Sequence, residues 1–482
     1  MIYDTVLAKS FSRYEQKKLG YGAFVSCLFI VFSLCTVFKP YLGPVHVLNL
    51  KLFIGVDTKM LITGSSSQIG KVKENKAKVV VEDTGSSPQM DKNKVERKET
   101  EKEELLCTSE ERTEFCQARG DIRVQGKSST VYIASSKATM LEKNMSWSLK
   151  PYARRDDAGA MTSVREWTLK VVNVNQKVPQ CTQNHSIPAV VFSTGGYTGN
   201  HFHEFTDILI PLFLTARQFN GKVQFIITNK RPWWISKHES LLKKLSHYEI
   251  MDIDEDDEVH CFPRVNVGLK RHHKELSIDP QKHSYSMKDF RAFLRSSYAL
   301  KRLEAIKIIN GQHRKPRLMI LSRKRSRSFI NTDEIEKMAK SFGFDVIVME
   351  AGRSMWGFAH VVNSCDVLLG VHGAGLTNIL FLPENAVFIQ VVPYALEWLA
   401  TNDFGMPSKD MNIKYLEYKI SLEESTLVEQ YPVDHMFMKD PSVIGKMGWQ
   451  EFKSVYLDKQ NIKLDVDRFK PTLQRALELL NK

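Results

Sequence analysis

Between residues 121 and 228 the hydrophobic residues form several strand-like runs and one stripe at helical spacing. Residues 121–135 and 164–174 are rich in strand-favouring side chains. From residue 189 an apolar strand, AVVFST, leads into a glycine-rich turn and then into apolar side chains at helical spacing across 202–216. Pro211 predicts a kink or a late start in this helix. The next apolar run, KVQFIIT, predicts another strand.

Strands and helices alternate more regularly in the second half. The apolar runs RLMIL, DVIVME, DVLLGV and AVFIQVVP are separated by helical stretches. Fully apolar strands that alternate with helices are typical of a parallel sheet covered on both faces. Ligands bind such sheets at the carboxyl ends of the strands. Arg323, Glu350 and His372 each follow one of these strands, so we expect a ligand site there in an α/β fold.

Residues 19–38 are twenty uncharged, mostly apolar residues, enough to span the roughly 30 Å core of a bilayer. The segment is too long for the apolar part of a cleaved signal, and a buried core helix is the alternative. Four basic residues precede it and only two lysines follow closely. The positive-inside tendency therefore predicts a cytosolic tail over 1–18, a signal-anchor over 19–38 and a body on the far side of the membrane.

The stretch after the predicted anchor is polar and charged. Residues 65–104 contain few large apolar side chains and cannot bury enough surface to fold, so we predict a flexible stem over 39–104. A solvated helix is the alternative, and it would also act as a spacer. The remaining length suffices for two α/β domains, which we place at 105–310 and 311–482.

Charge narrows the class of partner without deciding it. The chain has 68 Lys and Arg residues against 55 Asp and Glu, a net charge of +13. This excess fits nucleic acid, anionic lipid, an acidic polysaccharide or a nucleotide-linked substrate. The predicted luminal position disfavours nucleic acid. Glycosylation triplets at Asn144 and Asn184 agree with a luminal body.

Five cysteines follow the predicted anchor, so at least one stays unpaired within the chain. Cys107 and Cys116 flank a short segment that a disulfide could close in an oxidising compartment. Cys365 lies in an apolar run, and we predict a free, buried thiol. The pairing of Cys181 and Cys261 stays open. None of the five forms a CxxC pair, which disfavours a zinc ribbon.

Two segments have the character of anion-binding sites. In VHGAGLTN, Gly373 and Gly375 allow the backbone to approach a ligand, and the following helix offers free N–H groups to a phosphate or sugar. A tight strand–helix turn is the alternative. The segment Ser322–Arg327, SRKRSR, places four cations at a strand end and suits a diphosphate, because arginine gives bidentate contacts and stays charged. A solvated basic loop is the alternative.

A third segment, NHFHEFTD, has the character of an acid–base site. On a helix His203 and Asp207 share one face, with Asn200 three residues before His203. A carboxylate that orients an imidazole makes a general base. Glu204 is the competing base. The alternative is an N-capping Asn200 with a satisfied core histidine.

The acidic run that begins with Asp252-Ile-Asp254 contains DxD sequences, whose carboxylates could chelate a divalent cation beside a nucleotide. Acidic runs are usually solvated loops, so we predict no metal site. A metal-dependent transferase of the GT-A type stays an alternative interpretation.

From about Leu105 to its end, the chain resembles plant members of glycosyltransferase family 61 that decorate cell-wall xylan. The resemblance rests on GGYTGNHFHEFTDILIPLF, PRLMILSRKRSRSFIN and NSCDVLLGVHGAGLTNILFLPENA, with KPYARRDDAGAM and GDIRVQGKSSTVYI fitting the xylan group more narrowly. It implies a GT-B fold with two Rossmann-like domains, a type II position in the Golgi membrane, and inverting, metal-independent transfer from a nucleotide sugar without a cofactor.

The resemblance also implies roles for the three segments. Arg323 and Arg327 would hold the diphosphate, and His203, oriented by Asp207, would take the proton of the acceptor hydroxyl. Glu204 is the weaker candidate for that proton. The remaining donor-side positions are Ser322, Glu350, His372, Gly373, Ala374, Gly375, Thr377 and Asn378, and Asn200 lies on the acceptor side.

The expected donor is UDP-xylose or UDP-arabinofuranose, with a slight preference for xylosyl transfer, and the expected acceptor is β-1,4-xylan. Other xylan-synthesis enzymes are candidate partners and nucleic acid is not. One alternative is a non-catalytic Golgi protein that keeps the fold and binds polysaccharide or a sister enzyme. Another is a transferase that uses UDP-N-acetylglucosamine.

Overall fold

The computed structural model describes residues 104–136, 146–271, 274–308, 314–352 and 354–481. They belong to one compact unit that runs from Val95 to Lys482, and the other unit of the chain, Met1–Lys94, lies outside them. The predicted tail, anchor and stem, apart from Glu104, lie outside the described residues, as does Asn144. Within the described ranges, no helix combines the length and apolar character needed to cross a bilayer.

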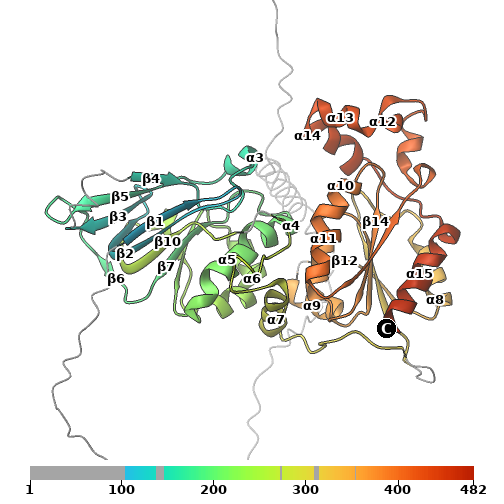
Figure 1. The fold of residues 1–482 in the computed structure, drawn as a ribbon, viewed down its shortest axis with the longest axis horizontal. Coiled ribbons are helices and arrows are strands. Elements are labelled where there is room, and N and C mark those ends of the chain that lie inside the picture. The colour runs from blue at the N-terminus through green and yellow to red at the C-terminus, as the bar shows by residue number, and fades with distance from the viewer. Residues whose placement is uncertain (1–103, 137–145, 272–273, 309–313, 353, 482) are drawn as a thin grey trace, which may run out of the picture. The chain divides into compact units, whose positions relative to one another are not determined.

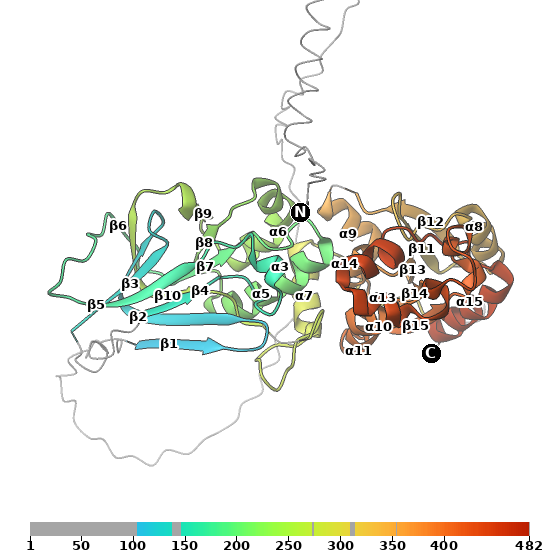
Figure 2. The same ribbon diagram turned by 90° about the horizontal axis from the view of Figure 1, so that it is seen from above.

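The first sheet has ten strands and is mixed. Its main path runs β4-β5-β3-β2-β10-β7-β8-β9, with β1 beside β2 and β6 beside β10 (Figures 1 and 2). The strands are β1 (Glu104–Ser109), β2 (Glu114–Gln125), β3 (Thr130–Ser135), β4 (Ser146–Leu149), β5 (Trp167–Asn173), β6 (Gln183–Asn184), β7 (Ala189–Ser193), β8 (Gln224–Thr228), β9 (Met251–Asp252) and β10 (Val259–Val267).

This sheet departs from a plain Rossmann-like arrangement. Strands β10, β7, β8 and β9 are mutually parallel along the path, which is the arrangement expected from the strand–turn–helix pattern. On the other side of β10, β2 pairs antiparallel, with Gln125 opposite Val259. A hairpin partner, β3, follows β2. Parallel strands need crossover helices, whereas the short turn between β2 and β3 permits only antiparallel pairing.

The helices that follow β7 contain the predicted irregularity at Pro211. The segment starts as α4 (His201–His203), widens into the π-helical turn η2 (Glu204–Leu209) and continues as α5 (Ile210–Ala216). Pro211 is the second residue of α5. Proline has no N–H and its ring clashes with the carbonyl four residues earlier, so a local widening relieves the strain. The other helical elements here are α3 (Ala158–Met161), η3 (Arg217–Phe219), α6 (Pro232–Leu245), η4 (Ile253–Glu255) and α7 (Met287–Ser297).

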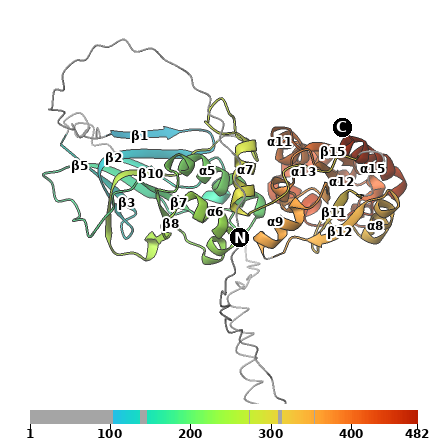
Figure 3. The same cartoon turned by 90° about the horizontal axis from the view of Figure 1, so that it is seen from below.

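The second sheet confirms the predicted alternation and with it the mixed α/β class. Its order is β12-β11-β13-β14-β15 and every pairing is parallel. Helices α8 and α15 pack together on one face, and α9 and α11 lie on the other (Figures 1 and 3). The strands are β11 (Arg317–Ser322), β12 (Asp345–Glu350), β13 (Val367–Val371), β14 (Val387–Val392) and β15 (Lys414–Lys419).

The helices around this sheet are mostly short. Helix α9 fills one of the helical stretches expected between the apolar strands, whereas the helix expected after the HGAG turn is the 3₁₀ element η5. The elements are α8 (Thr332–Ser341), α9 (Met355–Asn363), η5 (Ala374–Phe381), α10 (Glu397–Ala400), the π turn η6 (Thr401–Gly405), α11 (Met406–Asp410), η7 (Leu422–Glu424), η8 (Thr426–Glu429), α12 (Met436–Lys439), α13 (Pro441–Met447), α14 (Trp449–Phe452), the π turn η9 (Lys453–Leu457) and α15 (Val466–Leu480).

One hydrophobic core contains residues that pack on both sheets. Phe205 of η2 makes edge-to-face contacts with Phe290 of α7 and with Phe381 of η5, with ring centroids 6.3 and 6.2 Å apart. Such contacts add to the free energy gained from burying the rings. The core therefore fixes the helix that bears His203 against the helix that follows the HGAG turn.

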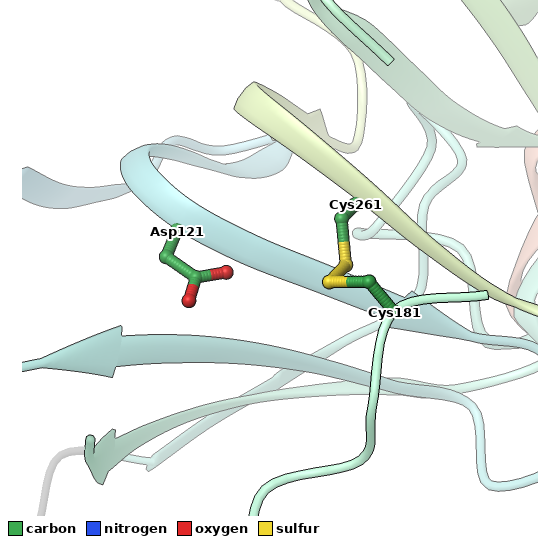
Figure 4. Close-up of side chains that lie close together, drawn as sticks. All are labelled: Asp121, Cys181 and Cys261. Carbon is green, nitrogen blue, oxygen red and sulfur yellow. A yellow bond between two sulfur atoms is a disulfide. The ribbon is translucent and has the colours of Figure 1, made fainter. Parts of the chain in front are cut away.

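The described cysteines match the sequence expectations. Cys107 and Cys116 form a disulfide, and Cys365 is free and buried. The pairing left open is a second disulfide, Cys181–Cys261. Figure 4 shows Asp121 beside it, and these three side chains are close enough to suggest a metal site. The two sulfurs are bonded to each other, however, and a cysteine binds metal as a thiolate, so the group is no ligand set in this state.

Candidate active site

His203 has one ring nitrogen held by a carboxylate and the other left free. Its Nδ1 lies 3.0 Å from Oδ2 of Asp207. The Asp207 carboxylate can only accept, so Nδ1 carries the ring proton and Nε2 presents a lone pair. The side chain of His203 is 19% exposed. The structure forms the predicted contact, although through the π turn η2 and not through a regular α-helix.

Asp207 is fully buried among cations. Its Oδ1 accepts from Arg271 Nη1 at 2.7 Å, and its Oδ2 accepts from Arg154 Nε at 2.9 Å and from the hydroxyl of Tyr152 at 3.0 Å. Burial by itself would raise the pKa of Asp207, but Arg271, His203 and Arg154 outweigh burial and hold that pKa well below its usual range. Asp207 is therefore a permanent negative charge that can stabilise a protonated His203.

Arg154 and Arg271 are parts of the site that reasoning from the sequence missed. They approach Asp207 from sequence distances of 53 and 64 residues, and both also contact Glu275. Only tertiary packing brings them together. The signal available beforehand was the segment KPYARRDDAGAM, which contains Arg154 but gives no indication of its partner.

The competing base, Glu204, is fully buried and already engaged. Its carboxylate contacts Lys237 and His238, the latter at 3.0 Å from Nε2, and accepts from the backbone of Gly199 at 3.2 Å. Burial would raise the pKa of Glu204, but His201, His238 and Lys237 lower it far below its usual range. With no exposed surface, Glu204 links the turn before α4 to α6 and does not face a substrate.

The turn before α4 positions an aromatic ring over His203. The Tyr197 ring lies 4.7 Å from the His203 ring, and its hydroxyl donates to Asp157 at 2.9 Å. Gly196 has a φ of +56°, and a Cβ there would meet the Tyr152 ring at 2.3 Å. Asn200, the predicted acceptor-side residue, is exposed and caps α4 by accepting from the backbone of Phe202, as the capping alternative expected.

Arg323 and Arg327 lie together against Gly373. A Cβ on Gly373 would meet Arg323 Nη1 at 2.7 Å and Arg327 Nη1 at 2.8 Å. Arg323 Nε donates to the Ser326 carbonyl and Arg327 Nη1 to the His372 carbonyl. No carboxylate of the described residues forms a salt bridge with either guanidinium. Two half-buried cations without a salt-bridge partner among the described residues suit an anion with several oxygens.

The pKa values of the two arginines and the backbone conformation of Arg327 agree with an anion-binding site. Burial, and then the neighbouring Arg323, lower the pKa of Arg327 to about 10, and burial also lowers the pKa of Arg323. Arg327 has a φ of +52°, which is uncommon for a residue with a side chain. Strain of this kind concentrates at ligand-binding positions, where the surrounding structure holds it.

The carboxyl ends of β11 and β12 border a hollow of about 390 Å³. Ser322, Arg323, Glu350 and Gly375, all predicted donor-side residues, line it. Ser322 and Glu350 are register partners in parallel strands, so they end at the same edge of the sheet. Glu350 forms an exposed ion pair with Lys324. A larger hollow, of about 590 Å³, lies away from these residues at the opposite ends of the same strands.

His372 is a neutral hydrogen-bond donor. Gln390 Nε2 lies 2.9 Å from its Nδ1, so the ring proton sits on Nε2, 3.8 Å from Oδ2 of Asp403. Burial, and then Arg327 and Arg323, lower the pKa of His372 to about 3. Thr377 and Asn378 are fully buried, and Asn378 donates to the Gly375 carbonyl at 2.8 Å. These two buried side chains support the HGAG turn from the protein interior.

The two halves of the candidate site meet at Phe404. Its ring lies 5.4 Å from that of Phe202, the neighbour of His203, and 5.7 Å from that of His372. Helix α4 also packs directly on η5. The structure thus brings His203, the HGAG turn and the arginine pair into one neighbourhood.

Comparison with known proteins decides the family. The profile of the family described as Glycosyltransferase 61 matches residues 201–389. A beta-1,2-xylosyltransferase of Oryza sativa subsp. japonica is 41% identical, with 77% of this chain and 83% of the relative covered. The chain belongs to the glycosyltransferase 61 family. A xylan glycosyltransferase of Arabidopsis thaliana is 38% identical, with coverage of 78% and 80%. An alpha-1,3-arabinosyltransferase of Oryza sativa subsp. japonica is 44% identical over 78% of this chain, but the match spans 65% of that relative, a little under two thirds.

In this glycosyltransferase 61 chain the DxD-like acidic residues are held by protein donors. Asp254 accepts from Arg165 and from the Thr228 hydroxyl, each at 2.7 Å, and from the backbone of Asn229 at 2.6 Å. Asp252 lies 3.5 Å from Lys230. These contacts leave Asp254 a structural carboxylate, which weakens the interpretation of a metal-dependent GT-A transferase.

Proposed function

We propose that the chain is an inverting glycosyltransferase that adds a pentosyl branch from a UDP-sugar to the β-1,4-xylan backbone. The observation that carries the proposal is the pair Arg323 and Arg327, which lies at the Gly373 turn without a described salt-bridge partner and in the same neighbourhood as the His203–Asp207 pair. Relatives with 38–44% identity bear the names of xylosyl-, arabinosyl- and xylan glycosyltransferases.

The two arginines would bind the diphosphate of the donor. Both guanidiniums are charged at physiological pH and partly withdrawn from water, where a charge-assisted hydrogen bond is stronger. As the bond from the anomeric carbon to the β-phosphate oxygen breaks, its electron pair leaves with UDP. Arg323 and Arg327 would stabilise the added negative charge, which is electrostatic catalysis by preorganised donors. The proposal assigns this task to the two side chains and not to a metal ion.

His203 would act on the other reactant. The acceptor hydroxyl attacks the anomeric carbon from the face opposite the diphosphate, so one displacement inverts the configuration. Nε2 of His203 takes the hydroxyl proton as the new C–O bond forms, and Asp207 stabilises the resulting imidazolium through Nδ1–H. The favoured donors are UDP-xylose and UDP-arabinofuranose, with a slight preference for xylosyl transfer.

The finer fold and the cellular position belong to the same proposal. The parallel strands β10, β7, β8 and β9 and the parallel second sheet support two Rossmann-like domains of the GT-B type, with the antiparallel strands added to the first. The uncharged segment 19–38 supports a single-pass type II protein of the Golgi membrane with a luminal catalytic body. Asn184 is exposed, which suits glycosylation in that compartment.

A donor screen tests the proposal. The purified full-length chain in detergent is incubated with xylo-oligosaccharides and UDP-xylose, UDP-arabinofuranose or UDP-N-acetylglucosamine, each with and without EDTA. We expect products heavier by one pentose, in equal amounts with and without EDTA. Transfer of N-acetylglucosamine alone would contradict the donor class. Transfer abolished by EDTA would contradict the metal-independent mechanism. A folded chain that binds xylan but turns over no donor would support the non-catalytic alternative.

A further inference from the structure

Asp403 is a carboxyl group in the candidate site that the proposed mechanism leaves unused. It lies in the π turn η6, next to Phe404, and its side chain is 21% exposed. Nε2 of His372 lies 3.8 Å from its Oδ2, which is beyond hydrogen-bond distance. A mostly buried carboxyl therefore points into this neighbourhood without a bonded partner among the residues described.

The other buried carboxylates nearby are saturated. Asp207 accepts hydrogen bonds from two arginines, a tyrosine, a threonine and His203. Glu275 contacts Arg112, Arg154 and Arg271. Glu204 is engaged by Lys237 and His238. Asp403 differs from these three carboxylates because it accepts no hydrogen bond from a described residue and keeps 21% of its side chain exposed, so it is available to a ligand that carries hydrogen-bond donors.

The position of Asp403 indicates the chemical class of that ligand. His372, which Asp403 faces, directly precedes Gly373, and Gly373 is the residue against which Arg323 and Arg327 lie. The diphosphate proposed there is bonded directly to the sugar that is transferred. Sugar hydroxyls are hydrogen-bond donors, and a carboxylate accepts two of them at once.

We propose that Asp403 binds the hydroxyl groups of the transferred sugar and so recognises the sugar of the nucleotide-sugar donor. This proposal rests on the proposed function, because the arginine pair must first place the diphosphate. In this sugar contact His372 presents its neutral Nε2–H toward the same carboxylate. Binding of UDP without a sugar does not involve Asp403.

The charges around Asp403 give this contact a pH dependence. Burial, and then Glu275, raise the pKa of Asp403 to about 7, while Arg154 and Arg112 oppose that rise. His372 faces the carboxyl from the end of β13 and stays neutral. Above about pH 7 the carboxylate accepts two hydrogen bonds, and below it one oxygen carries a proton. The affinity for the UDP-sugar relative to UDP therefore rises as the pH increases through 7.

Calorimetric binding of UDP, UDP-xylose and UDP-arabinofuranose tests the proposal without turnover. The full-length wild type is compared with Asp403→Asn and Asp403→Ala at pH 6 and pH 8. Asp410→Asn, in α11 of the same segment, is the matched control because Asp410 is exposed. We expect Asp403→Asn to weaken binding of the preferred UDP-sugar about tenfold at pH 8, to change UDP affinity less than twofold, and to remove the pH dependence of their ratio.

Each other result has a defined meaning. Equal losses of UDP and UDP-sugar affinity in both Asp403 variants would overturn the proposal and indicate a structural role. UDP-sugar affinities that stay at the wild-type value in both Asp403 variants would also overturn it. Wild type that binds none of the three nucleotides would contradict the proposed function itself, which separates the two failures.

Discussion

His203 and Glu204 are adjacent in the chain and chemically alike as proton acceptors, yet the structure separates them. His203 keeps one nitrogen accessible, whereas Glu204 is buried among Lys237, His201 and His238. The difference is one of orientation on a helical turn, because consecutive residues lie about 100° apart and face different neighbours. At this scale the candidate chemistry depends on which side chain faces out.

Replacing His203 therefore separates catalysis from folding. We expect His203→Ala to reduce kcat by about 10²–10⁴-fold, the usual contribution of a general base, while UDP affinity stays within twofold of wild type. Glu204→Gln is the contrasting variant. It removes the buried counter-charge of Lys237 and should lower the free energy of unfolding by about 3 kcal/mol. Steady-state kinetics and denaturant unfolding of both variants check this. A His203→Ala enzyme with wild-type kcat would remove His203 from the mechanism.

The basic segment Ser322–Arg327 contains an exposed arginine that serves as a control for substitutions in the arginine pair. Arg327→Ala should weaken UDP binding about 10- to 100-fold, because a hydrogen bond to a charged group contributes about 1.5–3 kcal/mol. Arg325, two residues earlier, is exposed, and Arg325→Ala should leave UDP affinity unchanged. Both affinities can be measured by calorimetry. Equal effects of the two substitutions would indicate a general electrostatic contribution of the loop and would contradict a specific diphosphate site.

At the scale of elements, the glycine turn after β13 depends on a missing side chain. Gly373 has a φ of +148°, and a Cβ there would meet both guanidiniums at 2.7 and 2.8 Å, whereas a Cβ on Gly375 would meet only the flexible end of Leu321, at 3.2 Å. We expect Gly373→Ala to displace the arginines and to reduce UDP affinity at least tenfold, and Gly375→Ala to have a much smaller effect. Calorimetry of the two variants tests this, and equal UDP affinities would show that the turn tolerates a side chain.

The elements also differ in how well the sequence predicts them. Four strands of the second sheet, β11 to β14, are short and mainly apolar runs that lie where the pattern places them. The fifth strand, β15, has the sequence KYLEYK and was not predicted, because it lacks such an apolar run. The residue contact between His203 and Asp207 follows from local spacing. Arg154, Arg271 and Asp403 lie on segments distant from His203 in the sequence. Their approach depends on tertiary packing, which leaves no periodic signal in the sequence.

At the scale of the whole molecule, the antiparallel side of the first sheet was not predicted for the same reason. Pairing of β2 with β10 joins segments separated by most of that sheet's sequence. The Cys181–Cys261 disulfide ties β10 to the chain 80 residues before it, whereas Cys107–Cys116 closes only nine. Cross-links act chiefly by restricting the unfolded chain, and the restriction grows with loop length.

Removing the two disulfides should therefore have unequal effects. We expect the Cys181→Ser, Cys261→Ser double variant to lose about 4.5 kcal/mol of unfolding free energy and the Cys107→Ser, Cys116→Ser variant about 2.5 kcal/mol, following the loop-entropy relation. Denaturant unfolding under non-reducing conditions measures both. A larger loss from the shorter loop would show that local packing and not chain entropy sets the effect.

The most direct test of the account is the stereochemistry of the transfer, followed by proton NMR. The full-length chain is supplied with the active UDP-pentose and a xylo-oligosaccharide, in parallel with His203→Ala. The account predicts one new pentosyl residue whose anomeric configuration is inverted relative to the donor, with the signal lost in His203→Ala and UDP binding retained. Retained configuration, or no pentose transfer by a folded chain that binds UDP, would contradict it.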